Sequence, residues 1–187
     1  MSTFFTADTH FDHQKIIGFC NRPFKDVHEM NAILIMNWNN TVKGGDVVYH
    51  LGDFSFGGKM RVEEILSQLN GQIHWIFGNH DHRDARRADG FAWKGDFKRI
   101  RVGETRISLM HYAMRVWPNS HHGAWHLYGH SHDGLAEEPL RACFDVGVDK
   151  WEFKPVSYEQ VADRIEKKIA FRRLMGIDPS VDHHKEL

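Results

Sequence analysis

The stretch QIHWIFGNHD occupies residues 72–81 and changes character after its sixth residue. The first six residues are mostly apolar, β-branched or aromatic, which is typical of a buried strand. Gly78 then begins a polar cluster in which asparagine, histidine and aspartate are consecutive. Such side chains bind metal ions or move protons, so the sequence predicts a functional site where this strand ends.

Six other runs share this apolar character and are predicted strands, and longer stretches with helix signals separate them. Asp26 with Glu29, and Ser157 with Gln160, form capping boxes that predict helices directly after them, and a shorter helix is expected over 59–69. This alternation is typical of an α/β protein. The seven predicted strands are 3–7, 46–51, 72–77, 97–102, 105–110, 124–128 and 140–146.

Only Gly103 and Glu104 separate two of these strands, which predicts a tight hairpin and therefore an antiparallel pair. The sheets are expected to be mixed. The length of 187 residues is near the usual size of one domain. We expect a single domain over residues 1–187, with residues 178–187 as a flexible tail.

The charges balance, with 24 Lys and Arg against 25 Asp and Glu. No overall positive field would attract nucleic acid or an anionic membrane, so neither partner is expected. No run approaches the ~20 apolar residues of a membrane span, and the first residues do not form a signal peptide, so a cytoplasmic location is expected. Two cysteines are too few for a disulfide framework and are expected to be reduced. The oligomeric state stays open.

Metal-binding side chains follow five of the predicted strands. Because ligands bind beyond the carboxyl ends of strands in α/β sheets, these five clusters are expected to converge on one rim. Asp8 with His10, and His130 with His132, are spaced i, i+2, so on extended backbone each pair would point to one side. The predicted metal ligands are Asp8, His10, Asp53, Asn79, His111, His130 and His132.

This set contains two carboxylates, one amide and four imidazoles, which is more than one ion takes in a zinc-type catalytic site. It suits two ions that share a carboxylate. Two divalent ions, two carboxylates and a bridging hydroxide leave about one positive charge, which favours an anionic substrate such as a small phosphate ester. Mn²⁺ is the expected metal, and Fe, Ni or Zn also suit the ligand set.

Five motifs occur in order: DTH at 8–10, GD at 52–53, GNHD at 78–81, His111, and GHSH at 129–132. Together they resemble the calcineurin-like metallophosphoesterase superfamily, and HFDHQKIIGFCNRPF at 10–24, which begins with the last residue of the first motif, is similar to its small stand-alone bacterial and phage members. The resemblance implies a four-layer αββα sandwich, in which two mixed sheets are flanked by helices. The motif GDFSFGG lacks the arginine of Ser/Thr protein phosphatases, which argues against that activity.

The resemblance also implies roles for individual residues. His80 would lie off both metals beside the scissile phosphate, with Asp81 orienting it, and Asp53 would bridge the two ions. The first ion would be held by Asp8, His10 and His132, and the second by Asn79, His111 and His130.

These roles predict a binuclear phosphohydrolase in which a metal-bridging hydroxide attacks phosphorus and His80 protonates the leaving oxygen. A phosphodiester, nucleotidic or otherwise, is favoured because its poor leaving group needs that proton. A phosphomonoesterase on a small metabolite and a non-catalytic metal-bound scaffold remain alternatives. A nuclease is disfavoured by the neutral charge and the small size.

The segment after His111 offers two candidate substrate contacts. Arg115 is expected to bind a phosphate oxygen, and Trp117 to provide an apolar or stacking wall. The alternative, in which the tryptophan packs inside the protein and the arginine is solvated, stays open.

Several further residues have open or structural interpretations. The roles of His13, Arg22, His82, His121 and His122 are undecided. A satisfied buried histidine is favoured at position 126, and structural roles are favoured for His50, His74, Asp145 and Asp149, the two aspartates in a turn. The basic residues Arg83, Arg86 and Arg87 are expected on a solvated helix face.

Overall fold

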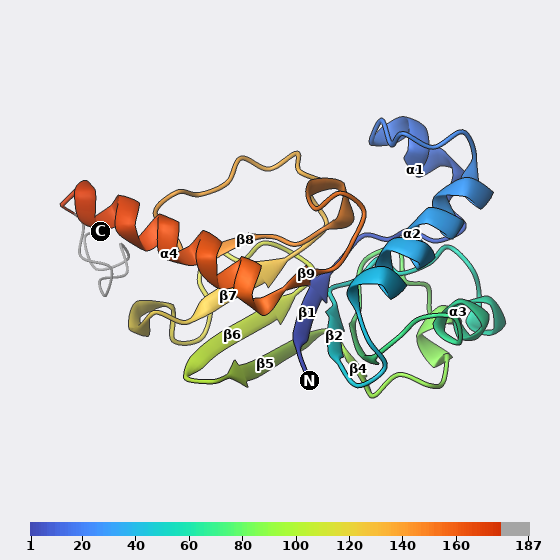
Figure 1. Cartoon of the computed structure of the whole chain (residues 1–187), viewed down its shortest axis with the longest axis horizontal. Helices are drawn as coiled ribbons and strands as arrows, with labels where there is room; N and C mark the ends of the chain where they lie inside the picture. The colour runs from blue at the N-terminus through green and yellow to red at the C-terminus, as the bar shows by residue number, and fades with distance from the viewer. Residues whose placement is uncertain (177–187) are drawn as a thin grey trace.

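The computed structural model describes residues 1–176 and contains two mixed β-sheets in that range (Figure 1). The predicted tail at 178–187 lies outside the described residues. One sheet has the order β4-β3-β2-β1-β9 and the other β5-β6-β7-β8. The strands are β1 (Thr3–Thr6), β2 (Val47–His50), β3 (Gln72–Ile76), β4 (Trp93–Gly95), β5 (Phe97–Val102), β6 (Thr105–Met110), β7 (Trp125–Tyr128), β8 (Cys143–Asp145) and β9 (Val156–Ser157).

Because several neighbouring strands are parallel, their carboxyl ends lie together at one end of each sheet. In the first sheet β1 to β4 pair in parallel, and β9 joins β1 antiparallel. In the second sheet β5 and β6 form the predicted antiparallel hairpin, with Val102 opposite Thr105, while β6, β7 and β8 are parallel. The carboxyl ends of β1, β2 and β3 therefore share one edge of their sheet, and those of β6 and β7 share an edge of theirs.

Two of the helices begin where the capping residues predict. The side chain of Asp26 accepts a hydrogen bond from Glu29 N at 2.9 Å, and Ser157 with Gln160 forms a complete capping box. A short helix near residue 14 and the short strands β4 and β9 were not predicted, because so few residues show no clear periodicity. The helices are α1 (Gln14–Phe19), α2 (Val27–Thr41), α3 (Lys59–Leu66) and α4 (Tyr158–Leu174), with 3₁₀ turns η1 (Ala85–Arg87), η2 (Ser120–His122) and η3 (Val148–Lys150).

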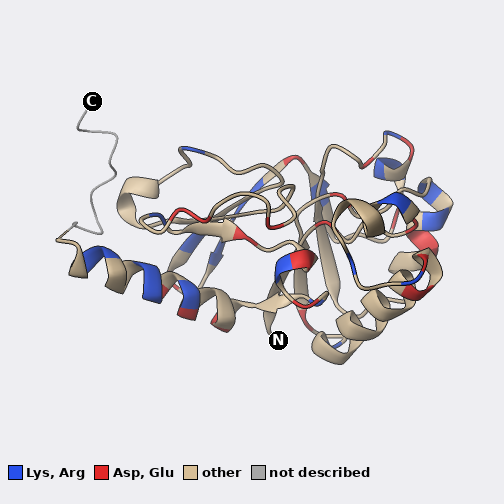
Figure 2. Ribbon diagram, turned by 90° about the horizontal axis from the view of Figure 1, so that it is seen from above, with Lys and Arg blue, Asp and Glu red and all other residues tan. Residues whose placement is uncertain are grey.

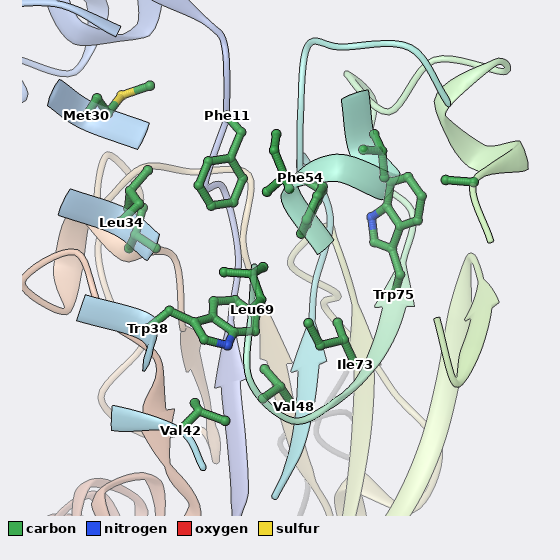
Figure 3. Close-up of a cluster of buried hydrophobic side chains, with 14 of the residues drawn as sticks. Phe11, Met30, Leu34, Trp38, Val42, Val48, Phe54, Leu69, Ile73 and Trp75 are labelled. Carbon is green, nitrogen blue, oxygen red and sulfur yellow. The ribbon is translucent and has the colours of Figure 1, made fainter. Parts of the chain in front are cut away.

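Alternation along the strands divides the core between two faces. Phe4 points to the side covered by α2 and α3, where Leu34 and Trp38 of α2 meet Val48 and Ile73 of the sheet (Figure 3). The buried residues Met30, Leu34 and Trp38 recur every four residues along α2, so one side of this helix packs on the sheet.

The neighbouring residue Phe5 points the other way, into a second cluster between the two sheets. Leu109 and Leu127 join this cluster from the second sheet, and Val161 and Ile165 join it from α4. The two mixed sheets thus face each other across a shared core with helices packed against them, as the expected metallophosphoesterase fold requires.

Helix α4 runs across the second sheet and carries a row of basic residues (Figures 1 and 2). Lys168 donates to the backbone carbonyl of Cys143 in β8 at 2.6 Å and lies 2.8 Å from Glu137, while Lys167 pairs with Asp163. Lys168 therefore helps to fix the helix on its sheet, whereas the exposed Lys167–Asp163 pair lies within the helix. No helix within residues 1–176 is long and apolar enough to cross a membrane.

Candidate metal centre

The structure brings the predicted metal-binding side chains together in two adjacent groups. Within each group, the possible ligand atoms all lie within 4.8 Å of one another. Asn79 adjoins the second group, since its Oδ1 is 2.9 Å from His111 Nε2. The first group contains Asp8, His10 and His132, and the second contains Asp53, His111 and His130.

The carboxylate of Asp53 lies between these groups. Its Oδ2 is 3.4 Å from His10 Nε2 and 3.5 Å from His111 Nε2. Both Asp53 Oδ2 and His10 Nε2 are buried atoms without a hydrogen-bond partner in the described part of the chain. Buried polar atoms almost always have a partner, so this arrangement fits bound cations that would satisfy both atoms.

Five of the seven predicted ligands have left-handed backbone. Their φ angles are +57° at Asp8, +50° at His10, +55° at Asp53, +71° at His130 and +46° at His132. The expectation of two pairs on extended backbone is therefore wrong, because each pair turns sharply instead of continuing its strand. This conformation costs roughly 1–2 kcal/mol per residue and is found where function requires it.

Two motif glycines allow backbone to approach the ligand carboxylates. A Cβ at Gly78 would lie 2.2 Å from Asp53 Oδ1, and one at Gly129 would lie 2.6 Å from Asp8 Oδ2 and 2.5 Å from the Cβ of Ala7. Glycine is thus required here to leave space for the carboxylates themselves.

Three of the four histidines are held through Nδ1, which leaves Nε2 available as a ligand atom. The Nδ1 atom of His111 is 2.8 Å from the Leu51 carbonyl oxygen, that of His10 is 3.1 Å from His13 Nδ1, and that of His132 is 2.7 Å from Asp149 Oδ2. Such contacts orient a ligand ring and select its tautomer. His13, whose role was open, is therefore a contact of the predicted ligand His10.

The ionisation states also favour cation binding. Burial lowers the pKa of His111 to about 4 and lowers that of His10 further, so both rings are neutral at pH 7. Burial, with Asp145 and Asp53 nearby, raises the pKa of Asp8 well above its usual value. Neutral imidazoles bind metals, and a nearby cation offsets the electrostatic repulsion between buried carboxylates.

His80 lies beside the two groups. Its backbone N–H donates to Asp53 Oδ1 at 2.8 Å, and its ring centroid is 5.4 Å from that of His10. The half-exposed ring of Phe56 borders the same place, 5.4 Å from His80 and stacked on His13 at 3.7 Å. Phe56 was not predicted at the site, since a phenylalanine three residues after a Gly-Asp pair has no distinctive signal.

The expected contact from Asp81 to His80 is replaced by another arrangement. The Asp81 carboxylate accepts hydrogen bonds from the backbone N–H groups of Asp53, Phe54 and Gly78 at 2.7–2.9 Å, and from the Trp75 indole at 3.1 Å. With both oxygens occupied in this way, Asp81 holds the turn that carries Asp53 instead of orienting the His80 ring.

The predicted substrate wall at Trp117 is wrong. This side chain is only 5 % exposed, and its indole N–H donates to the Ala124 carbonyl at 2.8 Å, so the ring belongs to the core on the outer face of the second sheet. Its ring packs on His126, which is the satisfied buried histidine expected from the sequence. Arg115 is exposed, as the alternative interpretation proposed.

Two aspartates near the first group, Asp145 and Asp149, were expected only in a turn, and this holds for one of them. Asp149 is the middle residue of η3 and contacts both His132 and Arg22, so its role is not confined to a turn. Asp145 does accept a turn hydrogen bond, from Gly147 N at 2.6 Å. His82, His121 and His122 are exposed.

The sequence profile of the "Calcineurin-like phosphoesterase superfamily domain" matches residues 1–144, which include all seven predicted ligands. The chain therefore belongs to the calcineurin-like phosphoesterase superfamily.

Individual relatives extend over most of the chain. An uncharacterized protein of Methanocaldococcus jannaschii is 38% identical over 168 residues, covering 86% of this chain and 89% of the relative. The Gene 66 protein of Mycobacterium phage L5 is 30% identical over 196 residues, covering 88% and 94%. The crystal structure of a protein of unknown function from Aquifex aeolicus is similar in fold, with a TM-score of 0.67, 22% identity and coverage of 87% and 98%.

Proposed function

We propose that this protein is a binuclear metal-dependent phosphodiesterase acting on a small phosphodiester, nucleotidic or otherwise. The observation that carries the proposal is the position of Asp53 between two groups of ligand atoms, with Oδ2 buried and without a hydrogen-bond partner in the described residues. One carboxylate shared by two ions accounts for this arrangement more simply than a single ion does.

The donor set indicates which residues would hold the ions. Nitrogen and oxygen donors together suit Mn, Fe, Ni or Zn, and we propose Mn²⁺ as the metal for assays. When bound, two divalent ions lower the pKa of a shared water and withdraw charge from the phosphoryl oxygens. The first ion would be held by Asp8, His10 and His132, the second by Asn79, His111 and His130, and Asp53 would contact both.

His80 is the proposed general acid. Its ring lies next to His10, yet His80 falls outside both groups of possible ligands. A water-derived nucleophile attacks phosphorus, the bond from phosphorus to the leaving oxygen breaks, and His80 gives its proton to that oxygen. An alkoxide leaving group needs this proton most. A diester is favoured because its single negative charge matches the single positive charge left by two divalent ions, two carboxylates and a hydroxide.

Arg115 is proposed to bind a phosphate oxygen of the substrate. It is exposed in the segment that follows β6 and His111, two residues before the buried Trp117. Because charge-assisted hydrogen bonds contribute roughly 1.5–3 kcal/mol, Arg115→Ala should reduce kcat/KM for the preferred substrate by about 10-fold or more. Unchanged kinetics would exclude this contact.

The activity is tested with paired substrates. The Mn²⁺-loaded protein is assayed on bis(4-nitrophenyl) phosphate, 4-nitrophenyl phosphate and a series of 2′,3′- and 3′,5′-cyclic nucleotides, with His80→Ala as the control. We expect diesters to be hydrolysed faster than the monoester. His80→Ala should be strongly impaired on the cyclic nucleotides and less impaired on bis(4-nitrophenyl) phosphate. Preference for the monoester would assign a phosphomonoesterase, and no turnover on any ester would assign a metal-bound scaffold.

A further inference from the structure

The buried side chain of Arg22 connects two distant parts of the first ligand group. Its guanidinium, 0% exposed, contacts both carboxylate oxygens of Asp149 at 2.8 Å. It also donates to the backbone carbonyl of Asp8 at 2.7 Å and to that of Thr9 at 3.0 Å. Arg22 thus binds the left-handed turn that presents Asp8 while it holds Asp149 in place.

Asp149 in turn contacts the third member of that group. Its Oδ2 accepts from Arg22 Nη2 and also lies 2.7 Å from His132 Nδ1. A proton on Nδ1 leaves Nε2 of His132 free as the ligand atom. Among the predicted histidine ligands with a described Nδ1 contact, His132 is the one with a carboxylate at hydrogen-bond distance. The Nδ1 atom of His10 contacts an imidazole, and that of His111 contacts a carbonyl and lies 4.0 Å from the Asp8 carboxylate.

We infer that Asp149 and Arg22 are positioning residues that set the affinity of the first metal ion. The chain Arg22–Asp149–His132 fixes the imidazole ring and its tautomer. Residues that act on a metal through its ligands typically change affinity by 10- to 100-fold. The second group has no member in this chain of contacts, so its ion should be unaffected. This inference rests on the proposed two-ion site.

The structure also explains why the pair acts as a unit. Asp149 is 8% exposed and Arg22 is fully covered, so removal of the carboxylate alone leaves a buried guanidinium without its charge partner. Such a change destabilises the protein by itself. Replacement of both residues by apolar ones removes the pair without leaving a buried charge, and it therefore separates metal binding from folding.

The test is a calorimetric titration of metal-free protein with Mn²⁺, with thermal unfolding of each variant measured in parallel. The wild-type chain should show two binding events, and His132→Ala identifies which of them belongs to the first group. Asp149→Asn and the double variant Arg22→Met/Asp149→Leu should weaken that event by at least 10-fold and leave the other within 2-fold. Asp46→Asn is the control, because Asp46 is also a shielded aspartate that accepts hydrogen bonds from backbone N–H groups but lies at the opposite end of β2.

The tautomer gives a readout that a purely structural role would not change. In metal-free protein labelled with ¹⁵N-histidine, His132 should be protonated at Nδ1, and this preference should be lost in the double variant. Two wild-type binding events that both persist at unchanged affinity in a folded double variant would overturn the inference and leave the proposed function intact. One event or none in the wild-type chain would overturn both.

Discussion

Asp53 Oδ2 lies 3.4 Å from His10 Nε2, and each of these buried atoms lacks a hydrogen-bond partner in the part of the chain that the structure describes. The two residues come from different strand ends, 43 positions apart in the numbering. A carboxylate and a neutral imidazole brought together in this way form a site for a cation, and other ligands surround them on both sides.

Removal of the His80 ring should separate chemistry from metal binding. We expect His80→Ala to lower kcat by about 10²–10⁴-fold on an alkyl diester, because general acid catalysis contributes that much. The loss should be smaller on bis(4-nitrophenyl) phosphate, whose leaving group does not need a proton, and the metal content should be unchanged. Steady-state kinetics with elemental analysis would check this.

The matched control for His80 is its neighbour. His82 is exposed and contacts only the ring of Phe56 among the aromatic side chains described. His82→Ala should keep kcat within a few-fold of wild type. Equal losses in both variants, or a His80→Ala protein that has lost metal, would contradict the acid role.

Substitution of Gly129 should disturb the first ligand group. An alanine Cβ there would meet Ala7 and the Asp8 carboxylate at 2.5–2.6 Å, so Asp8 must move. Overpacking of this kind costs roughly 1–3 kcal/mol, and each kcal/mol lowers Tm by about 2–4 °C in a chain of this size. Gly129→Ala should therefore lower both Tm and the affinity for one ion.

Gly44 provides the control for this substitution. A Cβ at Gly44 has nothing within 4 Å, so Gly44→Ala should leave Tm and metal binding close to wild type. A Gly129→Ala protein that binds metal with normal affinity would show that Asp8 does not need its present position.

Acid should destabilise the protein through His126. Burial lowers the pKa of this ring to about 4 in the folded protein, against ~6.5 when unfolded. The unfolded chain therefore binds the proton more readily, and stability falls as pH drops from about 6.5 to 4. The shift corresponds to about 3 kcal/mol over this range.

The comparison variant is His126→Gln, whose amide can still donate and accept a hydrogen bond but does not titrate. Urea unfolding at pH 7, 6, 5 and 4 should show a smaller loss of stability with acid in the variant, by up to about 1.4 kcal/mol per pH unit. Parallel pH profiles for the two proteins would contradict the assignment.

The sequence was most informative where strands end. Residues such as Asp53 and His111 follow recognisable apolar runs, and the parallel order of the strands brings their ends together, so the two mixed sheets and the convergence of the ligands could be predicted. The left-handed backbone at Asp8 and His130 could not, because aspartate and histidine adopt it only in particular tertiary surroundings.

The main errors in the roles predicted from the sequence concern residues whose contacts lie far away along the chain. Arg22 and Asp149 are 127 residues apart, and neither has a local pattern that indicates the other. Trp117 follows a predicted ligand closely in sequence, yet its segment folds over the outer face of the second sheet and buries the ring. Proximity along the chain to a site residue therefore does not place a side chain in the site.

The central claim is that two ions share Asp53, and the number of ions bound per chain tests it most directly. Chelator-treated protein is reconstituted with Mn²⁺, freed of weakly bound metal and measured by elemental analysis. The arrangement of Asp53, His10 and His111 predicts two ions per chain. One ion or fewer would contradict the account.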